Sequence, residues 1–92
     1  MRDYEAVFVF RAEDELYKKG KTLVQETFAK AKISVQKEED MGGRELAYPI
    51  GKETRGHYHL YEIQADPESI TEISQATKLI DPVLKHLFVR AD

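Results

Sequence analysis

The sequence predicts an α+β domain in which a four-stranded antiparallel sheet carries two helices on one face. Four stretches alternate apolar and polar side chains, as strands do, and two longer stretches repeat apolar residues at helical spacing. Their order along the chain is βαββαβ, which is typical of the ferredoxin-like arrangement. The length of 92 residues suits one hydrophobic core, so we expect a single domain over residues 1–92.

The first two elements are predicted to be a central strand and an amphipathic helix. Residues 2–10 gain apolar side chains on both faces toward their C-terminal end, as a central strand does. Residues 13–32 form the helix, with acidic residues in its first turn. Gly20 lowers helix propensity by roughly 1 kcal/mol relative to alanine, so we expect it to mark close packing on the sheet. The strand directs Tyr4, Ala6, Phe8 and Phe10 to one side, and the apolar side of the helix comprises Leu16, Gly20, Leu23, Val24, Thr27, Phe28 and Ala31.

The next stretch, residues 33–63, is predicted to form a β-hairpin. Its first strand begins with the alternation at residues 33–37 and continues to residue 50, with a bulge at residues 42–43. Pro49 lacks an N–H group, so this strand is expected at an edge of the sheet. The six residues 51–56 have glycine at both ends and are expected to reverse the chain. In the returning strand the core-facing side chains are predicted to be His57, His59, Tyr61 and Ile63.

A second helix and a last strand complete the predicted domain. Asp66 is the expected N-cap, and Pro67 is the expected first helical residue. The helix is predicted to end near Asp81 and Pro82, because the residue before a proline disfavours helical geometry. Its apolar stripe is Ile70, Ile73, Thr77 and Ile80. In the strand of residues 83–90 we expect Leu84, His86 and Phe88 on one side and Val83, Lys85, Leu87 and Val89 on the other.

With both helices on one side, the sheet keeps a second face without helices, which we call the open face. Strand alternation predicts that this face carries Val7, Val9, Tyr58, Leu60, Leu87 and Val89. So much apolar surface is unusual on a free monomer, and large exposed apolar patches mark interaction sites. The open face is therefore predicted to bind a partner.

Composition argues against several classes of function. The chain has no cysteine and no asparagine, and it lacks a nucleophile elbow and a phosphate-binding glycine loop, so we expect no catalytic residues, no cofactor and no enzymatic activity. His57 and His59 lie two apart, with His86 elsewhere, but hydrogen-bonded core or rim positions are favoured over a metal site. No apolar run predicts a membrane span, and no signal-peptide pattern opens the sequence, so we expect a cytoplasmic protein.

The net charge of −3 means that any contact with nucleic acid must be local or shared with a basic partner. Residues 55–61 faintly resemble the basic, glycine and aromatic pattern on the third strand of RNA-recognition motifs. The stacking positions of that pattern, however, fall here on His57 and His59. A glycine turn that leads into a strand is the favoured interpretation of this run.

Two stretches of the sequence, residues 1–5 and the run GGRELAYPI at residues 42–50, resemble the bacterial small-ribosomal-subunit protein S-six family. Gly56, followed by an aromatic strand, adds to this resemblance, which covers nearly the whole chain. It implies a structural component of the small ribosomal subunit, located on the ribosome in the cytoplasm. It also implies binding to the central domain of small-subunit ribosomal RNA together with the basic small-subunit protein S eighteen.

The resemblance and the open face together suggest site residues. For RNA contacts we expect Arg2, Tyr4, Arg44, Lys52, Lys85 and Arg90. For contacts with the partner protein we expect Leu46, Tyr48, Ile50, Tyr58 and Leu60. An alternative function stays open, namely a free-standing ferredoxin-like interaction or small-ligand module that self-associates through its edge strand.

Overall fold

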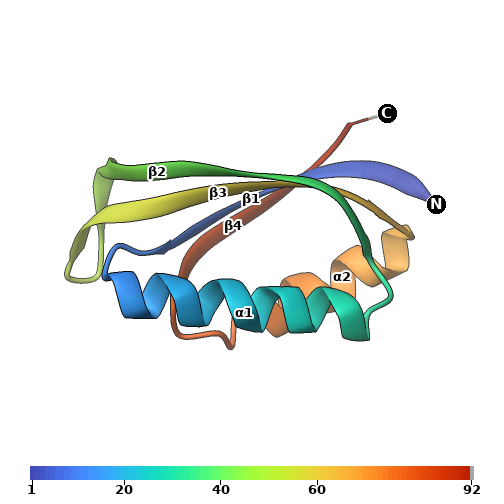
Figure 1. The fold of residues 1–92 in the computed structure, drawn as a ribbon, viewed down its shortest axis with the longest axis horizontal. Coiled ribbons are helices and arrows are strands. Elements are labelled where there is room, and N and C mark those ends of the chain that lie inside the picture. Colours follow the sequence, from blue (N-terminus) through green and yellow to red (C-terminus); the bar gives the residue numbers. More distant parts are fainter. Residues whose placement is uncertain (92) are drawn as a thin grey trace.

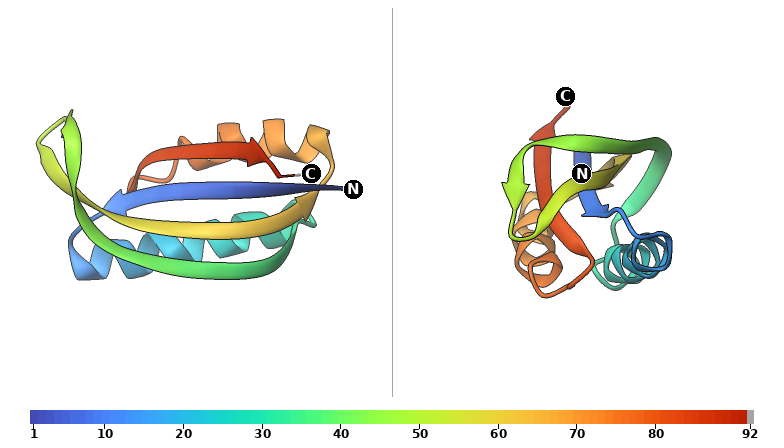
Figure 2. Two further views of the ribbon diagram at one scale, coloured as in Figure 1. Left: turned by 90° about the horizontal axis from the view of Figure 1, so that it is seen from above. Right: turned by 90° about the vertical axis from the view of Figure 1, so that its left-hand side faces the viewer.

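The computed structural model describes residues 1–91 as a layer of sheet packed on a layer of helices (Figure 1). The elements are β1 (Arg2–Arg11), α1 (Asp14–Lys30), β2 (Ser34–Ile50), β3 (Glu53–Ala65), α2 (Pro67–Thr77) and β4 (Val83–Arg90). Neighbouring strands are antiparallel in the order β2-β3-β1-β4, and both helices lie on the same face (Figure 2). The predicted fold class is confirmed. Within residues 1–91 no helix has the length and the apolar character that crossing a membrane requires.

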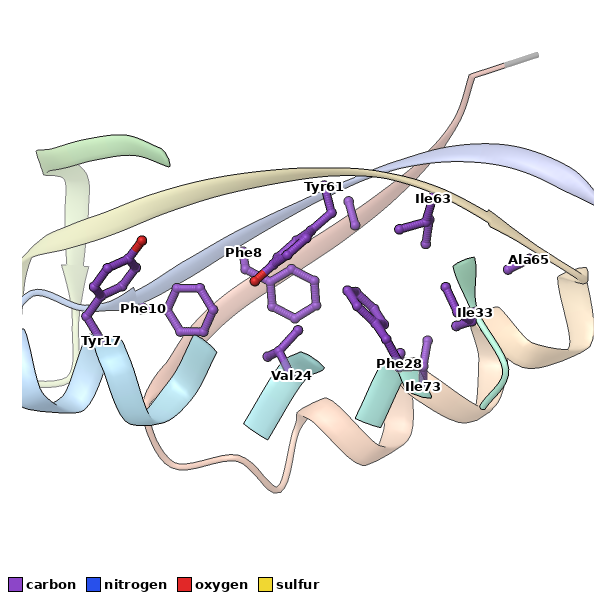
Figure 3. Close-up of a cluster of buried hydrophobic side chains, with 11 residues drawn as sticks. Phe8, Phe10, Tyr17, Val24, Phe28, Ile33, Tyr61, Ile63, Ala65 and Ile73 are labelled. Atoms are coloured by element: carbon purple, nitrogen blue, oxygen red, sulfur yellow. The ribbon is translucent and has the colours of Figure 1, made fainter. Parts of the chain in front are cut away.

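The core lies between the sheet and the helices and is built around β1. Because β3 and β4 flank β1, its helix-facing side chains Ala6, Phe8 and Phe10 are completely buried. Phe28 of α1 and Ile73 of α2 approach this layer from the helix side (Figure 3). Burial of a large apolar side chain contributes roughly 1.5–3 kcal/mol, so these contacts hold the helices on the sheet.

Helix α1 has nearly the predicted bounds, but Tyr17, which was not among the predicted apolar positions, packs against the sheet. Tyr17 is buried, whereas Leu16 is half-buried, and the Tyr17 ring lies 5.5 Å from that of Phe10, centroid to centroid. A Cβ added at Gly20 would lie 2.6 Å from Cδ1 of Phe10, so the close packing expected there is confirmed. The helix stops before Lys32, whose φ of 58° is incompatible with helical geometry.

The hairpin turn is shorter than the six-residue reversal that the sequence predicted, and β3 starts earlier. Ile50 pairs with Glu53, so a two-residue connection suffices, and Gly51 supplies its positive φ of 59°. The prediction was wrong about Gly56, which is buried inside β3. A side chain there would collide with Val9, so Gly56 permits close packing and plays no part in the turn.

Strand β2 forms one edge of the sheet, as Pro49 predicted, and it is irregular. Its register against β3 shifts at three places. One shift lies between Asp40 and Gly42, where the bulge was expected, and Gly42 accommodates it with a φ of 82°. A bulged edge strand is a poor template for pairing with a second chain.

Helix α2 begins where it was expected but is shorter than predicted. Pro67 is its first residue and Asp66 its N-cap, although the Asp66 side chain makes no capping hydrogen bond. The helix ends at Thr77, and the chain turns back so that the carbonyl of Pro82 accepts a hydrogen bond of 2.8 Å from the Arg11 N–H. The predicted end near Pro82 was wrong, because the return to the sheet requires an earlier exit from the helix.

Strand β4 forms the second edge, and its register places one residue differently from the prediction. The pairing of β1 with β4 slips between Val9 and Phe10, so Val83 lies opposite Phe10 and packs against the core. The placement of Val83 on the open side was therefore wrong, since a slip of one residue exchanges the faces. His86 and Phe88 contact the core ring of β1, as the alternation predicted.

We expect Gly56→Ala to destabilise the protein by about 1–3 kcal/mol, because the added methyl group would overpack against Val9 and lie 3.2 Å from Leu46. Urea unfolding measures this effect. Gly43→Ala is the matched control in the neighbouring strand, since its Cβ would lie 3.6 Å from Arg55, an ordinary contact. Equal stabilities of the two variants would contradict the close approach at Gly56.

Candidate functional site

The open face is ordered in rows of residues that lie opposite one another across the strands. Opposed residues in an antiparallel sheet share a face and interact. Successive rows lead from the β2–β3 hairpin, at one end of the sheet in Figure 1, to the start of β1 at the other end. In that direction the rows are Arg11, Gly56 and Arg44; Lys85, Val9, Tyr58 and Gly42; Leu87, Val7, Leu60 and Glu39; Val89, Glu5, Glu62 and Lys37; and Asp3, Gln64 and Ser34. Cations and an aromatic ring thus gather at the hairpin end, and carboxylates gather at the other.

A shallow hollow of about 70 Å³ lies at the hairpin end of the open face, where β2 and β3 twist around each other (Figure 2). Its lining consists of Val9, Leu46, Ala47, Tyr48, Ile50, Tyr58 and Lys85. Four of the five residues predicted to contact a partner protein are among them. Tyr48 is 65% exposed, so the hollow offers a large aromatic side chain to a second molecule.

The fifth predicted protein contact, Leu60, lies outside the hollow in the next row. It is half-buried, opposite Val7 on β1 and Glu39 on β2. Leu87 completes this row and is 54% exposed. The apolar surface therefore extends from the hollow to the middle of the sheet.

Three of the six predicted RNA contacts lie at the hairpin end of the sheet. The guanidinium carbon of Arg44 is 5.8 Å from the centroid of the Tyr58 ring, a cation–π geometry. Lys85 lines the hollow from β4, and Lys52 is exposed in the hairpin turn. The hairpin end therefore combines cations with apolar side chains.

The other three predicted RNA contacts, Arg2, Tyr4 and Arg90, lie at the opposite end of the sheet. A strand rises about 3.3 Å per residue, so Arg2 is about 23 Å along β1 from Val9, the residue opposite Lys85. Tyr4 packs partly buried against the core, with Arg90 opposite it on β4. The structure thus divides the six residues between two separate places.

Arg11 was not among the site residues predicted from the sequence, although its side chain connects three segments at the hairpin end. Its Nη1 donates a hydrogen bond of 2.9 Å to Oε1 of Glu53, and its Nε donates one of 3.1 Å to the carbonyl of Asp81. Nη2 also lies 3.6 Å from the Asp81 carboxylate. Arg11 joins the end of β1 to the start of β3 and to the α2–β4 connection. Its position directly after the last apolar residue of a central strand was the available signal.

A cluster of aromatic and acidic side chains holds the hairpin against α1. The hydroxyl of Tyr17, which points toward the sheet in Figure 3, lies 3.0 Å from Nδ1 of His59, and Nε2 of His59 lies 3.0 Å from Oε1 of Glu38. A neutral ring satisfies both contacts if Tyr17 donates and Nε2–H donates. His57 Nε2 is 2.5 Å from Oδ1 of Asp40, and its ring stacks on Tyr17 with 3.5 Å between centroids. Both histidines therefore occupy hydrogen-bonded positions.

Burial and hydrogen bonding control protonation in this cluster. It raises the pKa of Tyr17 to about 12, and the nearby Asp40 carboxylate adds to this effect. Burial also lowers the pKa of His59, because it disfavours the charged ring more than Glu38 stabilises it. The hydrogen bond from His57 lowers the pKa of Asp40. Across the described residues, 1–91, no group of three His, Cys, Asp or Glu side chains could hold a metal ion.

The chain matches the family model described as ribosomal protein S6 over residues 3–90. It is 41% identical to the small ribosomal subunit protein bS6 of Treponema denticola over 92 residues, which are 100% of this chain and 99% of that protein. Its identity to the bS6 protein of Treponema pallidum strain Nichols is 38% with the same coverage. The bS6 protein of Borrelia turicatae is 34% identical over 97% of this chain and 67% of its own length.

Solved structures share the fold. The chain is similar to the 30S ribosomal protein S6 from Thermotoga maritima, with a TM-score of 0.86 at 22% identity, over 98% of this chain and 87% of that one. It is also similar to the C-terminal domain of the MgtC protein from Mycobacterium tuberculosis, with a TM-score of 0.67 at 8% identity, over 99% and 88%. At such identities the likeness concerns the fold alone, which hosts unrelated functions.

Acidification is expected to destabilise the protein through His59. Burial lowers the pKa of His59 below its ordinary value of 6.5, so between the two values the unfolded chain binds a proton that the folded chain does not. The free energy of unfolding therefore falls as the pH drops below 6.5, by up to ~1.4 kcal/mol per pH unit for this group.

Urea unfolding from about pH 7.5 to about pH 5 measures this slope. Because burial also lowers the pKa of His86, His59→Gln should reduce the slope without abolishing it. His86→Gln is the matched variant, and combining both changes should leave the smallest slope. If His59→Gln left the slope of the unfolding free energy against pH unchanged, His59 would bind its proton as readily in the folded protein as in the unfolded chain.

Proposed function

This chain belongs to the ribosomal protein S6 family, and on that premise we propose that it binds the central domain of small-subunit ribosomal RNA as a pair with the basic small-subunit protein S eighteen. Family membership makes it a component of the small ribosomal subunit in the cytoplasm, and we propose a structural role without catalysis. The observation that carries the proposal is the hairpin end of the open face, where Lys85 lines an apolar hollow, Arg44 lies over the Tyr58 ring of that hollow, and Lys52 is exposed in the hairpin turn.

Exposed apolar surface supports a protein partner on this face. Tyr48 is 65% exposed at the hollow, and Leu87 and Val89 are 54% and 49% exposed on β4. Single exposed apolar residues are common on protein surfaces. Exposed apolar residues that form one continuous patch on a sheet face instead indicate a surface that a second protein covers. The partner is therefore expected to seat over the hollow and the middle of the sheet.

The charge distribution supports shared binding of RNA. With a net charge of −3, the chain has little overall attraction for a phosphate backbone. A basic partner seated on the hollow would lie next to Arg44, Lys52 and Lys85, so cations from both chains would face the same phosphates. Phosphate contacts of this kind position a protein on RNA and make its binding sensitive to salt.

Self-association through the edge strand is the competing function, and β2 argues against it. The strand has three register shifts against β3, contains Pro49 and carries three consecutive acidic residues at 38–40. Bulges, prolines and charges at an edge all discourage pairing with a second copy. The heterodimer is the favoured function for this reason.

We expect Tyr48→Asp to weaken pairing with protein S eighteen by about tenfold or more, because a charge would replace an aromatic side chain in the covered hollow. Tyr48 is 65% exposed, so the free energy of unfolding should change by no more than about 0.5 kcal/mol. Co-purification and a binding titration of the purified pair measure the first effect, and urea unfolding measures the second.

Leu79→Asp is the matched control for this change. Leu79 is 87% exposed in the connection between α2 and β4 and does not line the hollow, so pairing should be unaffected. Full pairing of the Tyr48→Asp protein would remove the hollow from the interface. A wild-type chain that forms homodimers and ignores protein S eighteen would support the competing function instead.

We expect Lys52→Gln and Lys85→Gln each to weaken RNA binding by the pair and to reduce the slope of log affinity against log salt concentration by about 1, as the loss of one phosphate contact does. Arg2→Gln tests the opposite end of the sheet in the same filter-binding assay. The control is Lys19→Gln, which removes an exposed cation from α1. If both hairpin-end variants bound with the wild-type slope, the RNA would lie elsewhere.

A further inference from the structure

The open face bears a group of carboxylates at the end away from the hairpin. Glu5 on β1 and Glu62 on β3 lie directly opposite each other, Glu39 lies on β2 in the next row, and Asp3 lies beyond Glu5. All four side chains are exposed. Among the described residues, Lys37, which lies opposite Glu62, is the one cation in the rows that contain these carboxylates.

The fold makes no internal use of these carboxylates. In the described residues, 1–91, none of the four forms an ion pair or a side-chain hydrogen bond. Like charges directly opposite each other on antiparallel strands repel. The Glu5 and Glu62 pair therefore disfavours the free protein, and among the described residues in these rows only Lys37, opposite Glu62, supplies a counter-charge.

An apolar row lies immediately beside the carboxylates. Val7, Leu60 and Leu87 oppose one another across three strands, and Leu87 is 54% exposed. Side chains on one face of a strand follow at about 6.6 Å, whereas a helix is about 10 Å wide with its side chains. An occupant that covers the apolar row therefore also lies over Glu5 and Glu62. Covering a carboxylate without a counter-charge is costly, so the occupant must supply cations.

We propose that a lysine- or arginine-rich segment of a partner protein lies across the open face, with apolar side chains on the row of Val7, Leu60 and Leu87 and cations at Glu5 and Glu62. The inference rests on the proposed function, because the basic member of the heterodimer supplies this segment. RNA does not fit this end of the face, since its phosphates would lie against carboxylates. The charge gradient along the strands also orients this segment, so that its cations lie at the end away from the hairpin, while other cations of the partner lie beside Arg44, Lys52 and Lys85.

The test is the double variant Glu5→Gln with Glu62→Gln, which removes both charges at nearly constant shape. The free protein should be at least as stable as the wild type in urea, because the repulsion disappears. Pairing with protein S eighteen should nevertheless weaken by about tenfold, and its salt dependence should fall. The matched control is Glu26→Gln with Glu72→Gln, which removes two exposed carboxylates from α1 and α2 and should pair as the wild type does.

Each outcome decides the inference. Wild-type pairing by the Glu5 and Glu62 variant, or an equal loss in the Glu26 and Glu72 control, overturns it. Stronger RNA binding by the pair without weaker pairing also overturns it, because the carboxylates would then act against RNA and not on a protein. If the variant pairs normally while Tyr48→Asp does not, this inference fails and the proposed function stands. If the wild-type chain never pairs with protein S eighteen, both fail together.

Discussion

The packing of the Phe8 ring joins the two halves of the fold on one side of the sheet, and the other side stays uncovered. The ring is fully buried, and its centroid lies within 6.0 Å of those of Phe28 on α1, Tyr61 on β3 and Phe88 on β4. Each helix connects two parallel strands that have one strand between them, and right-handed crossovers place both helices on one face. The aromatic layer is therefore enclosed from that side, and the opposite face receives no helix.

Strand β1 shows how one segment can serve two surfaces. Its side chains at Ala6, Phe8 and Phe10 form the core, while the alternate positions, from Glu5 to Val9, form the middle of the open face. Because successive side chains of a strand point to opposite faces, the requirements of stability and of binding fall on different residues. The open face could thus acquire its charge gradient without disturbing the packing beneath it.

The hairpin end, in contrast, depends on polar contacts for its position. Most side chains of β2 are exposed, so this strand gains little from the core. Its attachment to the rest of the protein runs through its ladder with β3 and through the contacts of Glu38 with His59 and of Asp40 with His57. Arg11 adds an ion pair at the base of β3. A network of neighbouring hydrogen bonds fixes the geometry of the surface that carries the hollow.

Local patterns in the sequence were sufficient for the order of the elements, for the faces of β1 and β3 and for the edge position of β2, because alternation, helical spacing and the missing N–H of Pro49 are properties of short segments. The structure then placed four of the five residues predicted to contact a partner protein around one hollow. Only the tertiary structure decided the packing role of Gly56, the side taken by Val83, the burial of Tyr17 and the separation of Arg2 from Lys85. These depend on strand register and on contacts between residues far apart in the chain, and a periodic pattern specifies a face without specifying the position along the neighbouring strand.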